Sequence, residues 1–350
     1  MSLNNYSIEF LKSGLSLNTH MGCNLGCKYC ILTTSLEQYP RIPTIINTAN
    51  KILEAILREN ALFIDGLTPI YINNRTDPLL PDVIESTYEM FDLLLKNNIS
   101  SPIVIVSKLA PDKRFFSYCQ KMKIVFIYTY SGLVGLDYNS YDEVYKKAII
   151  DINENVPYEN RFHFLRPIIP KYNDGYEVLY NILKQTSEVF RATISGGLRI
   201  NYVNSEKFNI IKYDKNHKLF SNNLWEIIKE ISKKLNYLVL RHTSCALALL
   251  VHKKNNLNYV NMKNHCLLEN CPNYSACVQE NQFSQSFVDA YIRRITHAKY
   301  IWSDKRTISF LDPIDQQIVA FLRVSFGLAV NYNKLILSPS ENEIVNYGEI

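Results

Sequence analysis

The chain has 350 residues, of which 47% are hydrophobic and 20% charged, and it carries a formal net charge of +5. This length and composition predict one large folded domain, or one domain with an appendage, and exclude an extensively disordered chain. The sequence has no apolar run long enough to span a bilayer and no signal-peptide plan at its N-terminus, so we expect a cytoplasmic protein. Basic and acidic residues are interleaved, which favours a small substrate over a long nucleic acid.

The first predicted strand, residues 14–18, runs directly into a loop with three cysteines, Cys23, Cys27 and Cys30. Three thiolates at this spacing can hold one face of an iron–sulfur cluster and leave one iron open to a small ligand. The alternatives are three unrelated thiols or a zinc site, for which His20 is the only local fourth ligand. Clustered cysteines in a reducing compartment indicate metal ligation more than disulfides.

Strands and helices alternate along the next part of the chain. A helix capped by Thr44 or Asn47 is expected after the cysteine loop. Further strands are predicted at 68–73, 103–107, 124–129, 162–166 and 192–200, and further helices at 84–96, 113–121, 141–153 and 176–190. This order predicts a parallel sheet with right-handed crossovers, whose functional groups lie on the loops after the strands.

The cysteine spacing, with the aromatic Tyr29 before the third cysteine, resembles the motif of the radical S-adenosylmethionine (radical SAM) enzymes. The resemblance implies a partial (β/α)6 TIM-type barrel with a [4Fe-4S] cluster. In that family the cluster cleaves S-adenosylmethionine (SAM) to methionine and a 5′-deoxyadenosyl radical, which abstracts hydrogen from the substrate. It also implies an electron donor such as flavodoxin or ferredoxin.

Two further stretches are similar to the branch of spore photoproduct lyase: Thr76-Asp77-Pro78 after the second strand, and Arg166-Pro167-Ile168-Ile169-Pro170 followed by Asn173-Asp174. The resemblance covers roughly the first two thirds of the chain. It offers no match for the cysteine that spore photoproduct lyase uses as hydrogen donor, and Cys119, on a predicted helix, is interpreted as a core residue.

This resemblance implies a set of SAM contacts at the strand ends. They are Tyr29 in the cysteine loop, Asn73, Asn74 and Asp77 after the second strand, Lys108 after the third, Ser131 after the fourth, and Arg166 and Ile168 at the fifth. The alternatives are an ordinary Asn/Asp turn in which Pro78 starts a helix, and a solvated surface lysine.

We predict a radical SAM domain over residues 1–215 and a C-terminal extension over residues 216–350, starting with a helix at 224–235 and a strand at 237–240. The extension holds Cys245, Cys266, Cys271 and Cys277, which are candidate ligands of a second iron–sulfur cluster or of a structural zinc ion. Unligated core thiols are the alternative. The tail from residue 282, with a helix near 287–295 and strands at 307–310 and 335–337, is expected to cover the open side of the barrel and exclude water.

The reaction that the resemblance and the 24 tyrosines favour is lysis of a small modified nucleobase, such as a queuine-like 7-deazapurine. Asp77, Asp174 and Asp312 are candidates for hydrogen bonds to the edge of such a base. Two alternatives stay open: a radical SAM enzyme with an auxiliary cluster that modifies a peptide or a nucleic acid, and a non-catalytic iron–sulfur or zinc protein.

Overall fold

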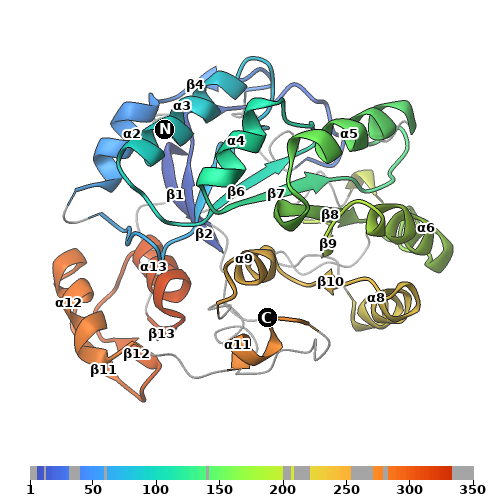
Figure 1. Cartoon of the computed structure of the whole chain (residues 1–350). Helices are drawn as coiled ribbons and strands as arrows, with labels where there is room; N and C mark the ends of the chain where they lie inside the picture. Colours follow the sequence, from blue (N-terminus) through green and yellow to red (C-terminus); the bar gives the residue numbers. More distant parts are fainter. Residues whose placement is uncertain are drawn as a thin grey trace.

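The computed structural model describes residues 6–11, 13–30, 40–58, 61–138, 142–199, 206–208, 221–253, 271–278 and 283–332. Its centre is an eight-stranded sheet in the order β1-β2-β5-β6-β7-β8-β9-β10, with helices packed on the outside (Figure 1). The edge strand β1 is antiparallel to β2, and the strands from β2 to β10 are mutually parallel. This arrangement confirms the predicted α/β fold with a parallel sheet, to which the structure adds one antiparallel strand at the edge.

Apart from the edge strand β1, which was not predicted, the strands of the main sheet agree closely with the predicted ones. They are β1 (Ile8–Leu11), β2 (Gly14–Leu17), β5 (Ile70–Ile72), β6 (Ile103–Ser107), β7 (Ile124–Thr129), β8 (Arg161–Ile168), β9 (Ala192–Gly197) and β10 (Val239–Leu240). β10 pairs in parallel with β9. The main sheet therefore continues beyond residue 215, and the predicted boundary at that point stays a prediction.

The outer helices are α2 (Ala49–Ile56), α3 (Ile84–Lys96), α4 (Arg114–Lys121), α5 (Asp142–Asn155), α6 (Tyr176–Ser187) and α8 (Asn222–Leu235), and a short 3-10 turn, η2 (Tyr158–Asn160), precedes β8. The predicted cap of the first helix was wrong. Thr48 caps α2 by accepting from the Lys51 N–H at 3.4 Å. Thr44 instead lies in β4 (Thr44–Ile45), because this segment pairs with β3 (His20–Met21) at the start of the cysteine loop.

Both faces of the main sheet are apolar, as expected for parallel strands that are covered on both sides. Side chains such as Leu17, Ile72 and Ile105 point outward and pack with the outer helices. The inner face is covered by α9 (Thr243–Val251), whose Leu247 and Leu249 pack in one cluster with inward-pointing side chains of β5 to β10. A helix from the C-terminal region thus fills part of the inside of the sheet.

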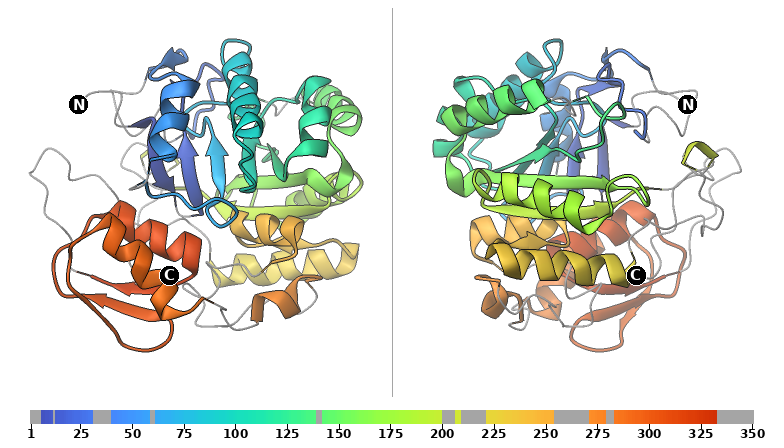
Figure 2. Two further views of the ribbon diagram at one scale, coloured as in Figure 1. Left: turned by 60° about the vertical axis from the view of Figure 1, so that its left-hand side comes forward. Right: turned by 90° about the vertical axis from the view of Figure 1, so that its right-hand side faces the viewer.

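The C-terminal unit lies beside the β1–β2 edge of the sheet (Figure 2). After α11 (Tyr274–Val278), it comprises α12 (Gln285–Ile295), β11 (Tyr300–Trp302), β12 (Thr307–Phe310), α13 (Gln316–Phe326) and β13 (Ala329–Asn331), whose strands form a three-stranded sheet. The predicted helix near 287–295 and strand at 307–310 are confirmed. The predicted strand at 335–337 lies outside the described residues.

The contact between this unit and the main sheet is made by α13. The side-chain oxygen of Gln317 accepts a hydrogen bond from the backbone N–H of Phe10 on the edge strand at 2.5 Å, and the Phe321 ring packs edge-on against Phe10, with centroids 5.8 Å apart. An exposed strand edge offers unpaired backbone groups to other chains. Here α13 covers part of that edge.

Candidate functional site

The cysteine loop lies at the carboxyl end of the parallel sheet, where the chain leaves β2 and passes through β3. Gly22 directly precedes Cys23 and has φ +99°, a backbone conformation that side chains other than glycine rarely adopt. A Cβ at this position would lie 2.3 Å from the carbonyl oxygen of Pro40. Only glycine therefore allows the 40–45 segment to pack this closely on the start of the loop.

The three thiols of the loop are sheltered to different degrees. Cys27 is buried, with 8% of its surface exposed, and Cys23 and Cys30 are half-buried. Burial raises the pKa of Cys23 to about 11. Burial also raises the pKa of Cys27 to about 12, with Lys108 opposing the rise and Asp137 adding to it. Bound metal would reverse this preference, because metal ligation requires the thiolate.

The chemistry of the donor set fits an iron–sulfur cluster. Three thiolates from one loop can each bind a different iron of such a cluster and leave the fourth iron open to a small ligand. The three thiols are near neighbours. Cys30 lies close enough to the other two for its charge to contribute to the raised pKa of both Cys23 and Cys27.

Polar groups from the next strand end lie against this loop. Asp77 is 6% exposed and accepts hydrogen bonds from the Ser107 hydroxyl at 2.7 Å and from the backbone N–H of Lys108 at 2.8 Å. Its negative charge adds to the raised pKa of Cys23, which places it near that thiol. The neighbouring Thr76 is 8% exposed, and its hydroxyl has no hydrogen-bond partner in the described part of the chain. A buried unpartnered hydroxyl beside the cysteine loop is suited to a polar ligand.

Asn73 and Asn74 follow β5 directly. The Asn73 side chain is fully buried: its oxygen accepts from the N–H and the hydroxyl of Thr19 at 2.8 and 2.9 Å, and its nitrogen donates to Thr87 at 2.9 Å. These bonds tie the end of β5 to the chain just before the cysteine loop. Asn74 is half-buried. Their expected contacts with SAM stay predictions.

The structure adds a residue that the sequence analysis missed, Asp137, in the loop after β7. This carboxylate accepts from the Tyr29 hydroxyl at 2.6 Å and from the Ser131 hydroxyl at 2.7 Å, and it forms an ion pair with Lys108 at 2.6 Å. It thereby joins three residues that were predicted separately as SAM contacts. The available signal was an aspartate in a strand-end loop that contains Gly132 and Gly135.

The stretch that ends β8 places its side chains on different sides of the sheet. The Arg166 guanidinium lies over the Phe164 ring on the inner face, 5.4 Å from the centroid, and its stem lies beside Gly196. Ile168 belongs to the large outer core, whereas Ile169 packs in a small cluster with Cys27 and Tyr29. Leu133, Leu198 and Phe208 complete that cluster.

The second group of cysteines is only partly described. Cys245 lies on α9 and packs against the inner-face cluster, and the Cys277 thiol accepts from the Asn273 amide at 3.4 Å. Cys271 is half-buried just before α11, and Cys266 lies outside the described residues. A second metal site therefore stays a prediction.

Cys119 packs against the outer core, as predicted, and burial raises its pKa to about 12.

The two remaining aspartates proposed to contact a base are separated in the fold. Asp174 accepts a hydrogen bond from the backbone N–H of Lys171 at 2.7 Å, in the loop after β8. Asp312 accepts from the backbone N–H of Lys299 at 2.7 Å, in the C-terminal unit. Of the three candidates, Asp77 is the one that lies beside the cysteine loop, since its charge contributes to the raised pKa of Cys23.

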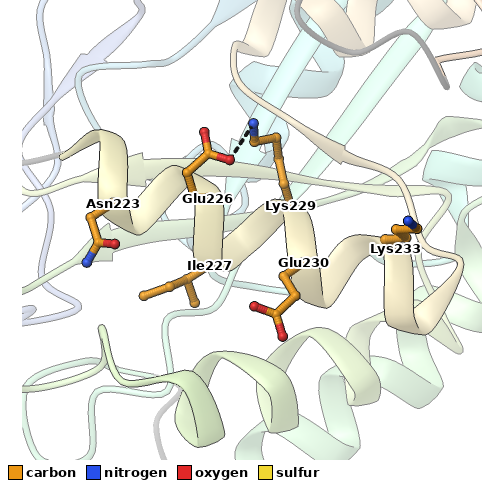
Figure 3. Close-up of a pocket in the computed structure, with 6 residues that line it drawn as sticks. All are labelled: Asn223, Glu226, Ile227, Lys229, Glu230 and Lys233. Carbon is orange, nitrogen blue, oxygen red and sulfur yellow. Dashed lines mark ion pairs between the residues drawn. The ribbon is translucent and has the colours of Figure 1, made fainter.

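Two surface depressions lie away from these residues. One, of about 480 Å³, follows the exposed side of α8, where Glu226 and Lys229 form an ion pair at 2.7 Å (Figure 3). All its lining residues come from one helix, so it is an open flank rather than a cleft. The other, of about 310 Å³, includes Arg191 and Tyr237 near the amino end of β9. Neither contains a residue of the cysteine loop or of the strand ends around it.

No helix in the described ranges has both the length and the apolar character needed to cross a membrane.

No protein-family model and no curated protein matches the sequence. Solved structures do match the fold. A point mutant of spore photoproduct lyase aligns with a TM-score of 0.52 at 12% identity, over 67% of this chain and 79% of that chain. Spore photoproduct lyase complexed with dinucleoside spore photoproduct aligns with a TM-score of 0.51 at 12% identity, over the same shares.

A second point mutant of spore photoproduct lyase gives a TM-score of 0.51 at 11% identity, again over 67% of this chain and 79% of that chain. The partial-barrel fold predicted from the cysteine motif and the strand-end stretches is thereby confirmed. The chain has the fold of spore photoproduct lyase.

Proposed function

We propose that this chain is a radical SAM enzyme in which Cys23, Cys27 and Cys30 hold a [4Fe-4S] cluster. The observation that carries the proposal is the position of these thiols, on a loop at the carboxyl end of a parallel sheet with the fold of spore photoproduct lyase. Ligands of parallel α/β sheets bind at this end. When bound, the cluster would supply the electron that splits SAM into methionine and a 5′-deoxyadenosyl radical.

The protein's part in this chemistry is to bind, orient and shelter. The proposed SAM contacts are Tyr29, Asn73, Asn74, Asp77, Lys108, Ser131, Arg166 and Ile168, supported for most of them by their place at the strand ends. Ile169, Leu133 and Phe208 pack around Cys27 and keep water from one side of the loop. The C-terminal unit would shield the open side of the barrel, a role supported by the hydrogen bond from Phe10 to Gln317 at the sheet edge.

The test begins with the protein purified from the cytoplasm of an expression host, in which the cluster is reconstituted without oxygen. Iron and sulfide are then measured, and the reduced sample is examined by electron paramagnetic resonance. SAM and a strong reductant are then added, and 5′-deoxyadenosine is measured by mass spectrometry. We expect Cys27→Ala to lose both the cluster signal and 5′-deoxyadenosine. Cys119→Ala is the matched control and should retain both, because Cys119 lies on α4, away from the loop.

Failure of a fully loaded wild-type protein to cleave SAM would overturn the enzymatic proposal and favour a non-catalytic iron–sulfur protein. Flavodoxin or ferredoxin is the proposed physiological electron donor. Replacing the chemical reductant with either protein in the same assay tests that partner.

For the substrate, we propose a small modified nucleobase and a lyase reaction, with a queuine-like 7-deazapurine as the first candidate. Support comes from the fold shared with spore photoproduct lyase, one structure of which contains a dinucleoside photoproduct. A panel of deazapurine bases would be screened for stimulation of 5′-deoxyadenosine release. Stimulation by none of them would exclude this substrate class, and stimulation by a peptide or an oligonucleotide would replace it.

A second metal site on Cys245, Cys266, Cys271 and Cys277 is part of the proposal, as an iron–sulfur cluster or a zinc ion. The density of soft ligands in this stretch supports it. Metal analysis of the Cys266→Ala/Cys271→Ala variant separates the two possibilities, because it should lose either iron or zinc.

A further inference from the structure

Asp137 is contacted by three separate parts of the fold. The Tyr29 hydroxyl, from the cysteine loop, and the Ser131 hydroxyl, from the end of β7, both donate to its Oδ2 at 2.6 and 2.7 Å. The Lys108 ammonium group, from the end of β6, lies 2.6 Å from its Oδ1. The Cys27 thiol donates to the same Oδ1 at 3.4 Å, and the backbone N–H of Tyr138 at 2.9 Å.

These contacts are strongly sheltered from water. Asp137 is 6% exposed and its side chain is completely buried, Ser131 is fully buried, and the Lys108 side chain is 12% exposed. A buried carboxylate is costly unless charge and hydrogen bonds compensate it. The hydroxyl groups of Tyr29 and Ser131 and the Lys108 ammonium group supply this compensation.

The loop that carries Asp137 also braces the cysteine loop through the backbone. The Leu136 carbonyl accepts from the Lys28 N–H at 2.9 Å. This loop turns at Gly132, with φ +65°, and a Cβ there would lie 2.7 Å from the Ile182 side chain. The cysteine loop is thus held from the β7 side by one backbone bond and by the Asp137 carboxylate.

The geometry points to Asp137 as a positioning residue that couples the cysteine loop to the strand ends of β6 and β7, so that the thiols, Lys108 and Ser131 are held in register for a common ligand. This inference rests on the proposed function for the identity of that ligand, SAM. The coupling itself is a property of the metal-free chain. Lys108 can keep its contact with Asp137 and offer a remaining N–H to an anionic ligand, because an ammonium group has three donors.

The first test measures hydrogen–deuterium exchange of the metal-free protein. Asp137→Asn removes the charge at nearly constant size, and we expect exchange in residues 24–30 to become roughly tenfold faster or more, as for the loss of a charge-assisted hydrogen bond. The control is Asp112→Asn, which breaks a similar arrangement remote from the site: Asp112 accepts from the Tyr88 hydroxyl at 2.7 Å and from the Arg114 guanidinium. This control should leave residues 24–30 unchanged.

The coupling is tested by a double-mutant cycle with Lys108→Met, which keeps the apolar stem and removes the cation. If Asp137 transmits the effect of Lys108, the single Lys108→Met variant also speeds exchange in residues 24–30, and adding it to Asp137→Asn has little further effect. Additive effects would overturn the inference. So would equal acceleration in the interior of β6 and β7, because that pattern reports general destabilisation.

The second test uses the reconstituted protein and measures equilibrium binding of SAM. We expect Asp137→Asn to bind SAM roughly tenfold more weakly at the same iron content, and Asp112→Asn to bind like the wild type. Unchanged affinity in Asp137→Asn would overturn the role toward the ligand. If the wild type itself binds no SAM, the proposed function fails, whereas the exchange result on the metal-free chain still decides the coupling.

Discussion

The side-chain hydroxyl groups of Thr68 and Ser325 lie 2.8 Å apart and share a hydrogen bond, although 257 positions separate them in the sequence. Thr68 lies just before β5, Ser325 lies near the end of α13, and both are fully buried. Buried hydroxyl groups need partners, so each of these two residues specifies the position of the other. The C-terminal unit is therefore fixed against the main sheet by a polar contact inside an apolar interface.

The first prediction concerns this interface. Phe321 is fully buried and packs against Phe10 of the edge strand. Phe321→Ala should lower the free energy of unfolding by about 3–5 kcal/mol, because it leaves a cavity between α13 and the sheet. Ile301→Ala in the same unit is the control: Ile301 is 52% exposed, and its loss should cost no more than about 0.5 kcal/mol. Equal denaturant midpoints for the two variants would contradict the docking of α13.

The second prediction compares two glycines of the cysteine loop, Gly22 and Gly26, which both have positive φ. A Cβ at Gly26 would meet no atom within 4 Å, whereas a Cβ at Gly22 would lie 2.3 and 2.7 Å from two backbone carbonyl oxygens. Gly26→Ala should cost about 1–2 kcal/mol of stability from its backbone conformation alone. Gly22→Ala should add about 1–3 kcal/mol of overpacking.

The shift of backbone that Gly22→Ala requires lies directly beside Cys23. We therefore expect reconstituted Gly22→Ala to contain clearly less iron per chain than Gly26→Ala. Iron analysis and thermal unfolding of both variants give the comparison. Equal iron content would mean that the 40–45 segment does not determine the position of the thiols.

The regular part of the fold was predictable because local pattern and tertiary role agree there. The bounds of β6, β7 and α3 match the predicted ones, since each is a continuous apolar run or a clear helical stripe. Thr44 illustrates the opposite case. Its segment could be interpreted as the start of a helix, and only the pairing with β3, which lies elsewhere in the sequence, holds it extended.

Single residues of the candidate site could be proposed from the sequence, but the contacts among them could not. The cysteine spacing and the strand ends are local features, and they indicated Tyr29, Lys108 and Ser131 one by one. Their common partner, Asp137, lies in a glycine-containing loop without periodicity, and its proximity to Tyr29 follows from the packing of loops 108 positions apart. The stretch from Cys245 suggested metal ligation, with unligated core thiols as the alternative, and it gave no sign that Cys245 lies on the helix that covers the inner face of the sheet.

The third prediction uses the raised thiol pKa values. In the metal-free chain, burial raises the pKa of Cys23 to about 11 and that of Cys27 to about 12, so both are protonated at neutral pH. Ligation requires thiolates, so uptake of iron and sulfide should release protons, and the rate of uptake should rise with pH between 7 and about 9. Proton release measured with a pH indicator in weak buffer checks this. Release as large in Cys27→Ala as in the wild type would contradict the assignment of that ligand.

The last prediction concerns His163, which is fully buried on β8. Its Nε2 lies 2.8 Å from the Tyr130 carbonyl oxygen, which can only accept, so Nε2 carries a proton, and its Nδ1 lies 2.9 Å from the Thr193 hydroxyl. Burial lowers its pKa to about 4, from 6.5 in the unfolded chain. Between these values the unfolded state binds more protons, so this residue's contribution to stability is lost as pH falls.

The expected loss from pH 7 to pH 4 is about 3 kcal/mol for this one group. Acidic side chains also titrate near pH 4, so the quantity to measure is the difference between the wild type and His163→Gln. The glutamine variant should be less stable at pH 7, because its amide cannot reproduce both ring hydrogen bonds. Its unfolding free energy should nevertheless change less steeply between pH 6.5 and 4, so that the two curves converge toward acid. Parallel curves would show that His163 takes up its proton equally in both states, and the buried neutral ring would then not be the native form.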